Sequence, residues 1–294
     1  MYLTNISGNI PISCLNLVGT HDSTTAFVSF SKFAKCQELS VKEQLEAGVR
    51  IFDIRLFAIN NTVYLIHGYA DCFCDEKKTG LLTFDMVLDT FTQFLKENPR
   101  ETIVVSIKKD RGAMGIFAEK FFSLFHKKYI LNNNIWFTEN RVPKLSEVRG
   151  KIVLMRRCRA KQKDRCGLDF SVWKNQKSKN ETEPFEITTK EKFSAIIQDC
   201  YNVEPYKKWE ICKNFCQYAK PDENTVAINF FSTASNSSPQ KNAAVINKYF
   251  NQYEIKTDEC SGWYVLDFVD KAICDKIMQT NFSLYSKKLL KQSD

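Results

Sequence analysis

Short apolar runs alternate with helical patterns along most of the chain. Polar residues follow each run, and several runs are rich in Val and Ile, as buried parallel strands are. The runs that predict strands cover residues 14–18, 49–57, 63–66, 102–107, 152–155, 194–197, 226–231 and 263–266. Because strands separated by helices favour a parallel sheet, the pattern predicts an α/β protein built as a barrel of about eight strands.

The helical patterns between these runs have recognisable ends. Residues 83–98 carry apolar side chains at i, i+3, i+4 and i+7, and a proline follows them. A shorter helix at 40–48 begins with a capping pair, Ser40 and Glu43, and ends at Gly48. Further helices are expected at 116–131, 207–218, 242–253 and 271–281.

Two segments depart from the alternation of strands and helices. The link from Phe57 to Val63 is too short for a helix, because a parallel crossover needs about a dozen residues or more. Those two strands are therefore antiparallel, or the barrel is irregular there. Residues 159–183 form a basic, polar insertion that we expect to be a long, part-ordered loop with a solvated face. With no internal repeat and no linker, residues 1–294 are expected to form a single irregular TIM (β/α) barrel domain.

Polar side chains collect where the expected strands end. Gly19 is expected to end the first strand, which leaves His21 and Asp22 on the following loop. Asp53 and Arg55 stand two apart in one strand, so both point to the same face. The other polar residues at strand ends are His67, Lys108, Arg157, Asp199, Tyr201 and Asp267. Because the carboxyl ends of parallel strands meet at one end of a barrel, we expect these side chains in one cleft.

Two histidines, an arginine and several carboxylates in one cleft suit phosphoryl transfer by general acid and base. One imidazole takes a proton from a hydroxyl, the other gives a proton to the leaving oxygen, and the arginine holds the phosphate charge. A simpler interpretation makes His21 an ordinary loop histidine and Asp53 with Arg55 a structural salt bridge. The third histidine, His126, lies in an apolar-rich helix and is interpreted as a surface or packing residue.

Composition limits the classes of protein and of partner. The 294 residues are 44% apolar and 26% charged, and the net charge of +8 favours anionic partners such as a membrane surface or a nucleic acid. No nucleic-acid-binding motif is present. Residues 1–5 lack the pattern of a secretory signal, and no apolar run reaches the roughly 18 residues of a membrane span. We therefore expect a cytoplasmic protein with peripheral membrane contact and reduced cysteines. We also expect a monomer with no cofactor or metal.

Three motifs resemble a known family. Gly-Thr-His-Asp-Ser at 19–23, Arg-Ile-Phe-Asp-Ile-Arg at 50–55 and His67-Gly68 are similar to the X domain of bacterial-type phosphatidylinositol-specific phospholipase C. The similarity continues, in the family's order, at 95–109, 149–157, 198–201 and 262–267. The resemblance implies an irregular TIM barrel that cleaves phosphatidylinositol to diacylglycerol and inositol 1,2-cyclic phosphate. Slow hydrolysis of the cyclic product is implied as well.

The resemblance also implies a role for each of the catalytic side chains. His21 would be the general base on the inositol 2-hydroxyl, oriented by Asp267. His67 would be the general acid for the diacylglycerol oxygen, assisted by Asp22. Carried over in the same way, the contacts to the inositol ring and its hydroxyls would come from Lys108, Arg157, Asp199 and Tyr201.

The remaining motif residues bear on metal dependence. Arg55 would bind the phosphate, and Asp53 would hold the network of base and arginine in place. Calcium-dependent eukaryotic members place a metal ligand where Arg55 stands, so the resemblance implies metal-independent chemistry. The loop at 232–238 lacks the tryptophan and tyrosine cluster of secreted bacterial members. Competing interpretations are a glycerophosphodiester phosphodiesterase, which would need a metal, and an inactive phosphoinositide-binding barrel.

Overall fold

A mostly parallel sheet organises the protein in this computed structural model, which describes residues 2–111, 116–189, 193–235 and 237–290. The strands follow the order β6-β7-β5-β2-β1-β12-β11-β10-β9, and β3, β4 and β8 lie off this path. Their bounds are β1 Leu17–Thr20, β2 Ile51–Ile59, β3 Thr62–His67, β4 Ala70–Asp71, β5 Ile103–Lys109, β6 Trp136–Phe137, β7 Ile152–Arg156, β8 Leu168–Asp169, β9 Phe185–Thr188, β10 Ser194–Gln198, β11 Thr225–Phe230 and β12 Trp263–Leu266. This confirms the α/β class and a parallel arrangement through the centre of the sheet.

The barrel is irregular at the two edges of its sheet. On one side β6 and β8 both pair with β7, and on the other β9 runs antiparallel to β10. Within the described residues no strand pairing joins these two sides, so the sheet does not close there. The long loop predicted at 159–183 is part ordered, since it contains β8 and a short 3-10 helix, Gln162–Asp164.

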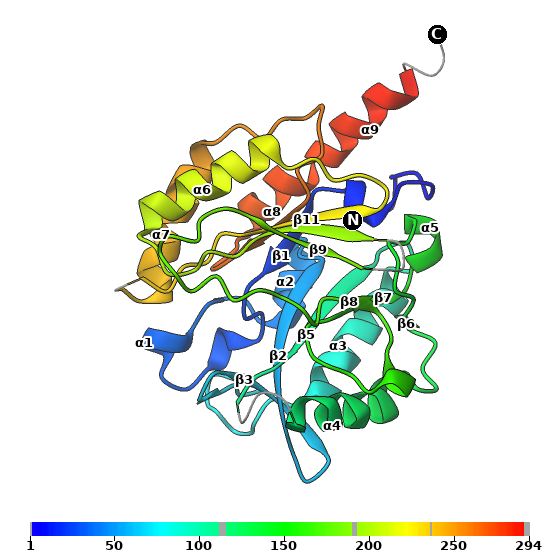
Figure 1. The fold of residues 1–294 in the computed structure, drawn as a ribbon, viewed down its shortest axis with the longest axis vertical. Helices are drawn as coiled ribbons and strands as arrows, with labels where there is room; N and C mark the ends of the chain where they lie inside the picture. Colours follow the sequence, from blue (N-terminus) through cyan, green and yellow to red (C-terminus); the bar gives the residue numbers. More distant parts are fainter. Residues whose placement is uncertain (1, 112–115, 190–192, 236, 291–294) are drawn as a thin grey trace.

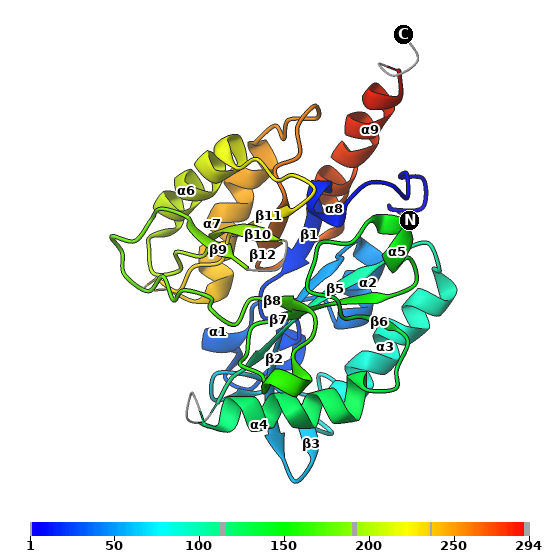
Figure 2. The same cartoon turned by 45° about the vertical axis from the view of Figure 1, so that its right-hand side comes forward.

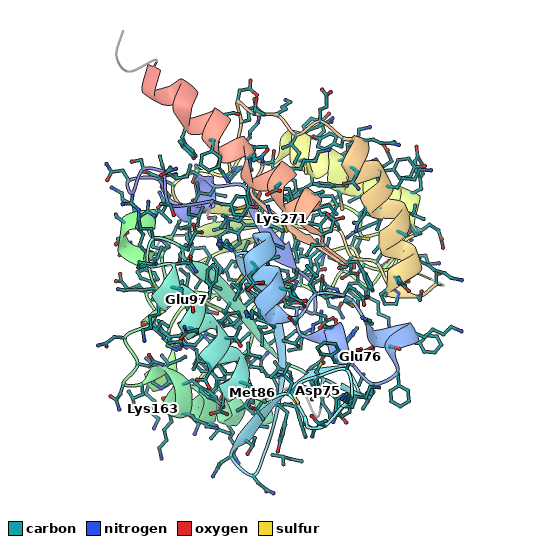
Figure 3. All side chains as sticks on the ribbon, turned by 180° about the vertical axis from the view of Figure 1, so that it is seen from behind. Asp75, Glu76, Met86, Glu97, Lys163 and Lys271 are labelled. Carbon is teal, nitrogen blue, oxygen red and sulfur yellow. The ribbon has the colours of Figure 1, made fainter. Side chains whose placement is uncertain are left out.

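Helices cover the outside of the sheet (Figure 1). Their bounds are α1 Ser31–Ala34, α2 Val41–Ala47, α3 Phe84–Glu97, α4 Ile116–Phe125, α5 Leu145–Val148, α6 Pro205–Tyr218, α7 Pro239–Gln252, α8 Lys271–Met278 and α9 Thr280–Leu290. Helices α6 and α7 pack together on one side, while α3 and α4 lie on the other (Figure 2). On the reverse face α2 and α3 are neighbours, and Met86 and Glu97 mark the two ends of α3 (Figure 3). None of the described helices is long and apolar enough to cross a membrane.

Local signals account for several helix ends. Ser40 and Glu43 form the predicted capping box of α2, and Gly48 follows that helix at φ 124°. The predicted helix at 271–281 was wrong as one element, because Gln279 separates α8 from α9. The helix predicted at 116–131 is α4 followed by a π-helical turn that includes His126. That histidine packs against the ring of Phe122, as its interpretation as a packing residue required.

The first strand differs from its prediction at both ends. Residues 12–14 form a 3-10 helix, and β1 runs through Gly19 instead of ending there. A Cβ atom on Gly19 would lie 3.0 Å from the side chains of Ile51 and Val265, which belong to the neighbouring strands β2 and β12. Gly19 is therefore a point of close approach between three strands, and the loop starts at His21.

An antiparallel hairpin resolves the short link between the second and third predicted strands. Asn60 and Asn61 both adopt positive φ, as a two-residue hairpin turn requires, and β3 returns along β2. Leu65 pairs with Leu56, so continuing the register by two residues places His67 opposite Ile54. His67 therefore reaches the carboxyl end of the barrel from a strand that runs against the others.

Candidate active site

A cleft of about 900 Å³ lies at the carboxyl end of the parallel strands. The structure brings all the predicted site residues together in or directly beneath it. The cleft is lined by His21, Arg55, His67, Lys108, Arg157, Asp199, Tyr201 and Asp267. Asp22 and Asp53 lie below its floor, 1% and 2% exposed, and both contact Arg55.

The pairing of β1 with β12 positions His21 next to Asp267. Thr20 lies opposite Leu266, so the residues that follow, His21 and Asp267, are neighbours. His21 Nδ1 is 2.9 Å from Asp267 Oδ1, and the side-chain amide of Gln37 donates to the carbonyls of His21 and Leu266. With Nδ1–H donating to the carboxylate, Nε2 is the ring nitrogen free to take a proton.

Asp22 connects both histidines and the arginine. Its backbone is in the left-handed region, at φ 43°, and its carboxylate is buried. One oxygen is 3.1 Å from His21 Nε2 and 3.3 Å from His67 Nε2, and the other is 2.7 Å from Arg55 Nε. These are close contacts and not hydrogen bonds, because neither oxygen receives a well-aligned hydrogen bond.

The two imidazoles face one another across this carboxylate. Their ring centroids are 6.3 Å apart and the rings are nearly perpendicular. His67 Nδ1 lies 2.8 Å from the carbonyl of Ala34, while its Nε2 faces Asp22. Both nitrogens of His67 therefore face oxygen acceptors, an arrangement that suits an imidazole with an N–H at each nitrogen. Burial disfavours charge on His21, but the carboxylates of Asp22 and Asp267 outweigh it and raise the pKa of His21.

Arg55 supplies a fixed positive charge next to the histidines. Its Nη2 is 2.9 Å from His21 Nε2 and 3.4 Å from Asp53, and its Nη1 is 3.8 Å from Asp110. Burial opposes the charged form, but the neighbouring carboxylates of Asp22 and Asp53 raise the pKa of Arg55 further. Burial likewise opposes the charge of Asp53, yet Arg55 and Arg157 lower the pKa of that carboxyl.

A second group of side chains extends from this centre along the cleft. Arg157 is 3.3 Å from Asp53 and 3.8 Å from Asp199. Its guanidinium carbon lies 3.7 Å from the ring centroid of Trp173, whose indole N–H donates to Asp199 at 2.9 Å. Lys108 also lines the cleft, and the charge of Arg55, together with burial, lowers the pKa of Lys108 to about 8.

Sequence reasoning missed the segment that supports this group, Ser171 to Gln176. Besides Trp173, Asn175 accepts a hydrogen bond from the Tyr201 hydroxyl at 2.7 Å, and Gln176 accepts one from the backbone N–H of Asp199 at 2.8 Å. A single tryptophan within a charged insertion was the one available signal. Asp110 was missed as well; it accepts from the backbone N–H of Gly68, next to His67.

Known proteins share both the fold and the motifs. The family model for the phosphatidylinositol-specific phospholipase C X domain matches residues 16–158, the part that carries both histidines and Arg55. The fold and site thus define an X-domain α/β barrel. The curated 1-phosphatidylinositol phosphodiesterase of Listeria monocytogenes is 27% identical over 92% of this chain and 81% of its own length. The one from Staphylococcus aureus strain Newman is 31% identical over 86% and 83%.

The solved structures agree with the sequence relatives. A phosphatidylinositol-specific phospholipase C from Staphylococcus aureus superposes with a TM-score of 0.78, at 26% identity, over 95% of this chain and 96% of that one. The corresponding structure from Listeria monocytogenes gives a TM-score of 0.72 at 23% identity and shows the likeness of fold. This chain belongs to the family of phosphatidylinositol-specific phospholipases C. The predicted irregular TIM barrel and the family resemblance are confirmed.

Proposed function

We propose that this protein cleaves phosphatidylinositol to diacylglycerol and inositol 1,2-cyclic phosphate by general acid–base catalysis without a metal. The observation that carries the proposal is the pair of histidines that share Asp22, with Arg55 between the carboxylates and His21 Nε2. The names of the relatives support the substrate, since they are 1-phosphatidylinositol phosphodiesterases.

The chemistry follows from the positions of the two rings. His21 Nε2 takes the proton of the inositol 2-hydroxyl, and the resulting oxygen attacks the adjacent phosphorus. His67 gives its proton to the diacylglycerol oxygen as the bond from phosphorus to that oxygen breaks. Arg55 neutralises the charge that grows on the phosphate, and Asp267 keeps His21 in the tautomer that leaves Nε2 free. In the slow second reaction the two histidines exchange roles on a water molecule.

Arg55 also bears on the metal question. Its guanidinium contacts three carboxylates, of Asp22, Asp53 and Asp110, and balances part of their negative charge. A fixed guanidinium supplies the positive charge that a phosphodiester transition state needs. Activity without an added metal is therefore part of the proposal.

The mouth of the cleft supports a substrate held in a lipid surface. Phe33 and Val172 line the cleft and are 70% and 71% exposed, and Phe30 and Tyr69 are exposed as well. Exposed apolar side chains around a cleft, together with a net charge of +8, favour peripheral docking on an anionic membrane. We include this docking, by a monomer, in the proposal. The single domain over 1–294 and the cytoplasmic location stay predictions.

Only some of the basic side chains from Arg156 onwards are available for this contact. Arg156 is buried against Asp169, and Arg157 serves the cleft, so neither faces a membrane. The exposed cations of the insertion are Arg159, Lys161, Lys163, Arg165, Lys174, Lys177 and Lys179. The structure does not describe the side chains of Lys287, Lys288 and Lys291.

Phosphorus NMR of the products from phosphatidylinositol in mixed micelles tests the proposal. Inositol 1,2-cyclic phosphate is expected first and inositol 1-phosphate later, with the same initial rate in EDTA. An analogue with a methylated 2-hydroxyl is the matched control and should not be cleaved. Inositol 1-phosphate without a cyclic precursor would show that water attacks directly. Loss of activity in EDTA that calcium restores would show that a metal is required.

A further inference from the structure

A thiol that the mechanism does not use lies at the catalytic pair. Cys36 is 1% exposed, and its Sγ is 4.0 Å from His67 Nδ1. Within the part of the chain that the structure describes, the ligand atoms of His21, Asp22 and Cys36 all lie within 4.8 Å of one another. We propose that these three side chains bind a thiophilic divalent cation such as Zn²⁺, and that this binding inhibits the enzyme. The inhibition rests on the proposed function, whereas the binding does not.

The chemistry of the three donors selects the metal. Sulfur, imidazole nitrogen and carboxylate oxygen are the ligands that zinc takes in proteins, and three protein ligands with one open position are common. Bond lengths of about 2.0–2.3 Å put the ligand atoms of a tetrahedral zinc site about 3.5 Å apart. The present atoms need to approach by about 1 Å. Calcium and magnesium prefer oxygen ligands alone, so this set does not suit them.

The thiol and the carboxylate are held in place before any metal arrives. The backbone N–H of Cys36 donates to Thr25 Oγ1 at 2.9 Å, and its carbonyl accepts from the backbone N–H of Phe268 at 2.8 Å. Asp22 is 1% exposed, and neither of its oxygens has a well-aligned hydrogen bond. The charge of this buried carboxylate is balanced by Arg55, whose Nε is 2.7 Å from one of its oxygens, and a bound cation would share that role.

Burial, together with the neighbouring carboxylates, keeps the thiol protonated until a metal binds. Burial raises the pKa of Cys36 well above its usual range, and the carboxylates of Asp267 and Asp22 add to this effect against the opposing charge of Arg55. Formation of the Zn–S bond therefore releases the thiol proton to solvent. The same carboxylates provide the negative field that attracts the incoming cation.

The cation would occupy atoms that catalysis needs. Arg55 Nη2 lies 2.9 Å from His21 Nε2, so the metal has to displace this contact to reach the nitrogen lone pair. A zinc-bound Nε2 cannot accept the proton of the inositol 2-hydroxyl. Inhibition is therefore competitive with substrate, and a chelator reverses it.

Calorimetric titration of the purified protein with zinc chloride, alongside phosphatidylinositol cleavage at matched free zinc, tests the proposal. Cys36→Ser and Cys36→Ala should each weaken zinc binding and raise the inhibitory zinc concentration by about tenfold or more. Cys158→Ser is the matched control, because Cys158 also lines the cleft but lies outside the cluster, and it should behave as the parent does. Each variant is compared with its own rate in EDTA.

Three results would overturn the proposal. The first is zinc binding that is equal in the parent and in both Cys36 variants. The second is inhibition by calcium at the concentrations at which zinc acts. The third is a parent enzyme that binds no zinc in the calorimeter. A protein that binds zinc through Cys36 but does not cleave phosphatidylinositol would refute the proposed function and leave the metal site intact.

Discussion

Replacing Trp173 with alanine tests whether the missed segment Ser171 to Gln176 builds the part of the cleft that holds the inositol ring. The change removes a ring centred 3.7 Å from the guanidinium of Arg157 and a hydrogen bond to Asp199. The stacking contact contributes about 0.5–2 kcal/mol and the charged hydrogen bond about 1.5–3 kcal/mol. Both interactions are made with protein side chains and not with the substrate. Only part of their energy is therefore expected to appear as a loss of catalytic efficiency. A loss of about 1.4–2.8 kcal/mol, or about 10- to 100-fold in kcat/KM, is expected.

Two substrates and one conservative variant locate the effect. Trp173→Phe keeps a ring over Arg157 but removes the N–H donor to Asp199, so its loss should be intermediate. Soluble inositol 1,2-cyclic phosphate shares the ring with phosphatidylinositol but needs no membrane. With both substrates the variant's kcat/KM should therefore fall, mainly because KM rises. The melting temperature shows whether the variant is folded. Normal hydrolysis of the cyclic phosphate by Trp173→Ala would refute the assigned role. A loss of kcat/KM confined to phosphatidylinositol in vesicles would show that Trp173 acts in membrane docking instead.

Three further predictions follow from the site. His21→Ala and His67→Ala should each lower turnover by about 10²- to 10⁴-fold without loss of fold, measured by product release and circular dichroism; near-normal turnover in either variant would exclude that histidine. Because the pKa of His21 is raised, its base form is lost as pH falls through a midpoint above about 6.5, and Asp267→Asn should move this acid limb of kcat/KM to lower pH. An acid limb that does not move would show that Asp267 does not raise the pKa of the catalytic base. Vesicle binding should rise with anionic lipid and fall with salt, and binding independent of both would remove charge from the docking proposal.

Much of the fold was predictable because its elements are built from local signals. Periodicity and caps identified α2 and α3, and short apolar runs identified the central strands. The error at Gly19 has a tertiary cause, since only the approach of Ile51 and Val265 explains a glycine inside β1. The break at Gln279 left no comparable mark, because the apolar pattern continues across it.

The candidate site was predictable to the extent that strand ends meet. His21, Asp53 and Arg55 follow from this rule, and the structure brings them within contact of one another. Trp173 and Cys36 do not, because each reaches the cleft along a loop whose path no local pattern specifies. Sequence alone places polar groups at strand ends, but it does not say which loops come back to cover them.

The shared carboxylate of Asp22 implies a constraint on turnover. In the proposed mechanism the two imidazoles share one proton beyond those of their neutral forms, and this proton rests on His67 before cleavage and on His21 after it. The enzyme that has just released diacylglycerol therefore has its proton on the wrong ring. Attack of water on the cyclic phosphate returns that proton, and so does exchange with solvent through side chains that are 17% and 23% exposed. The ratio of cyclic to open product then compares two rates, the rate at which the cyclic phosphate is released and the rate at which the proton returns to His67.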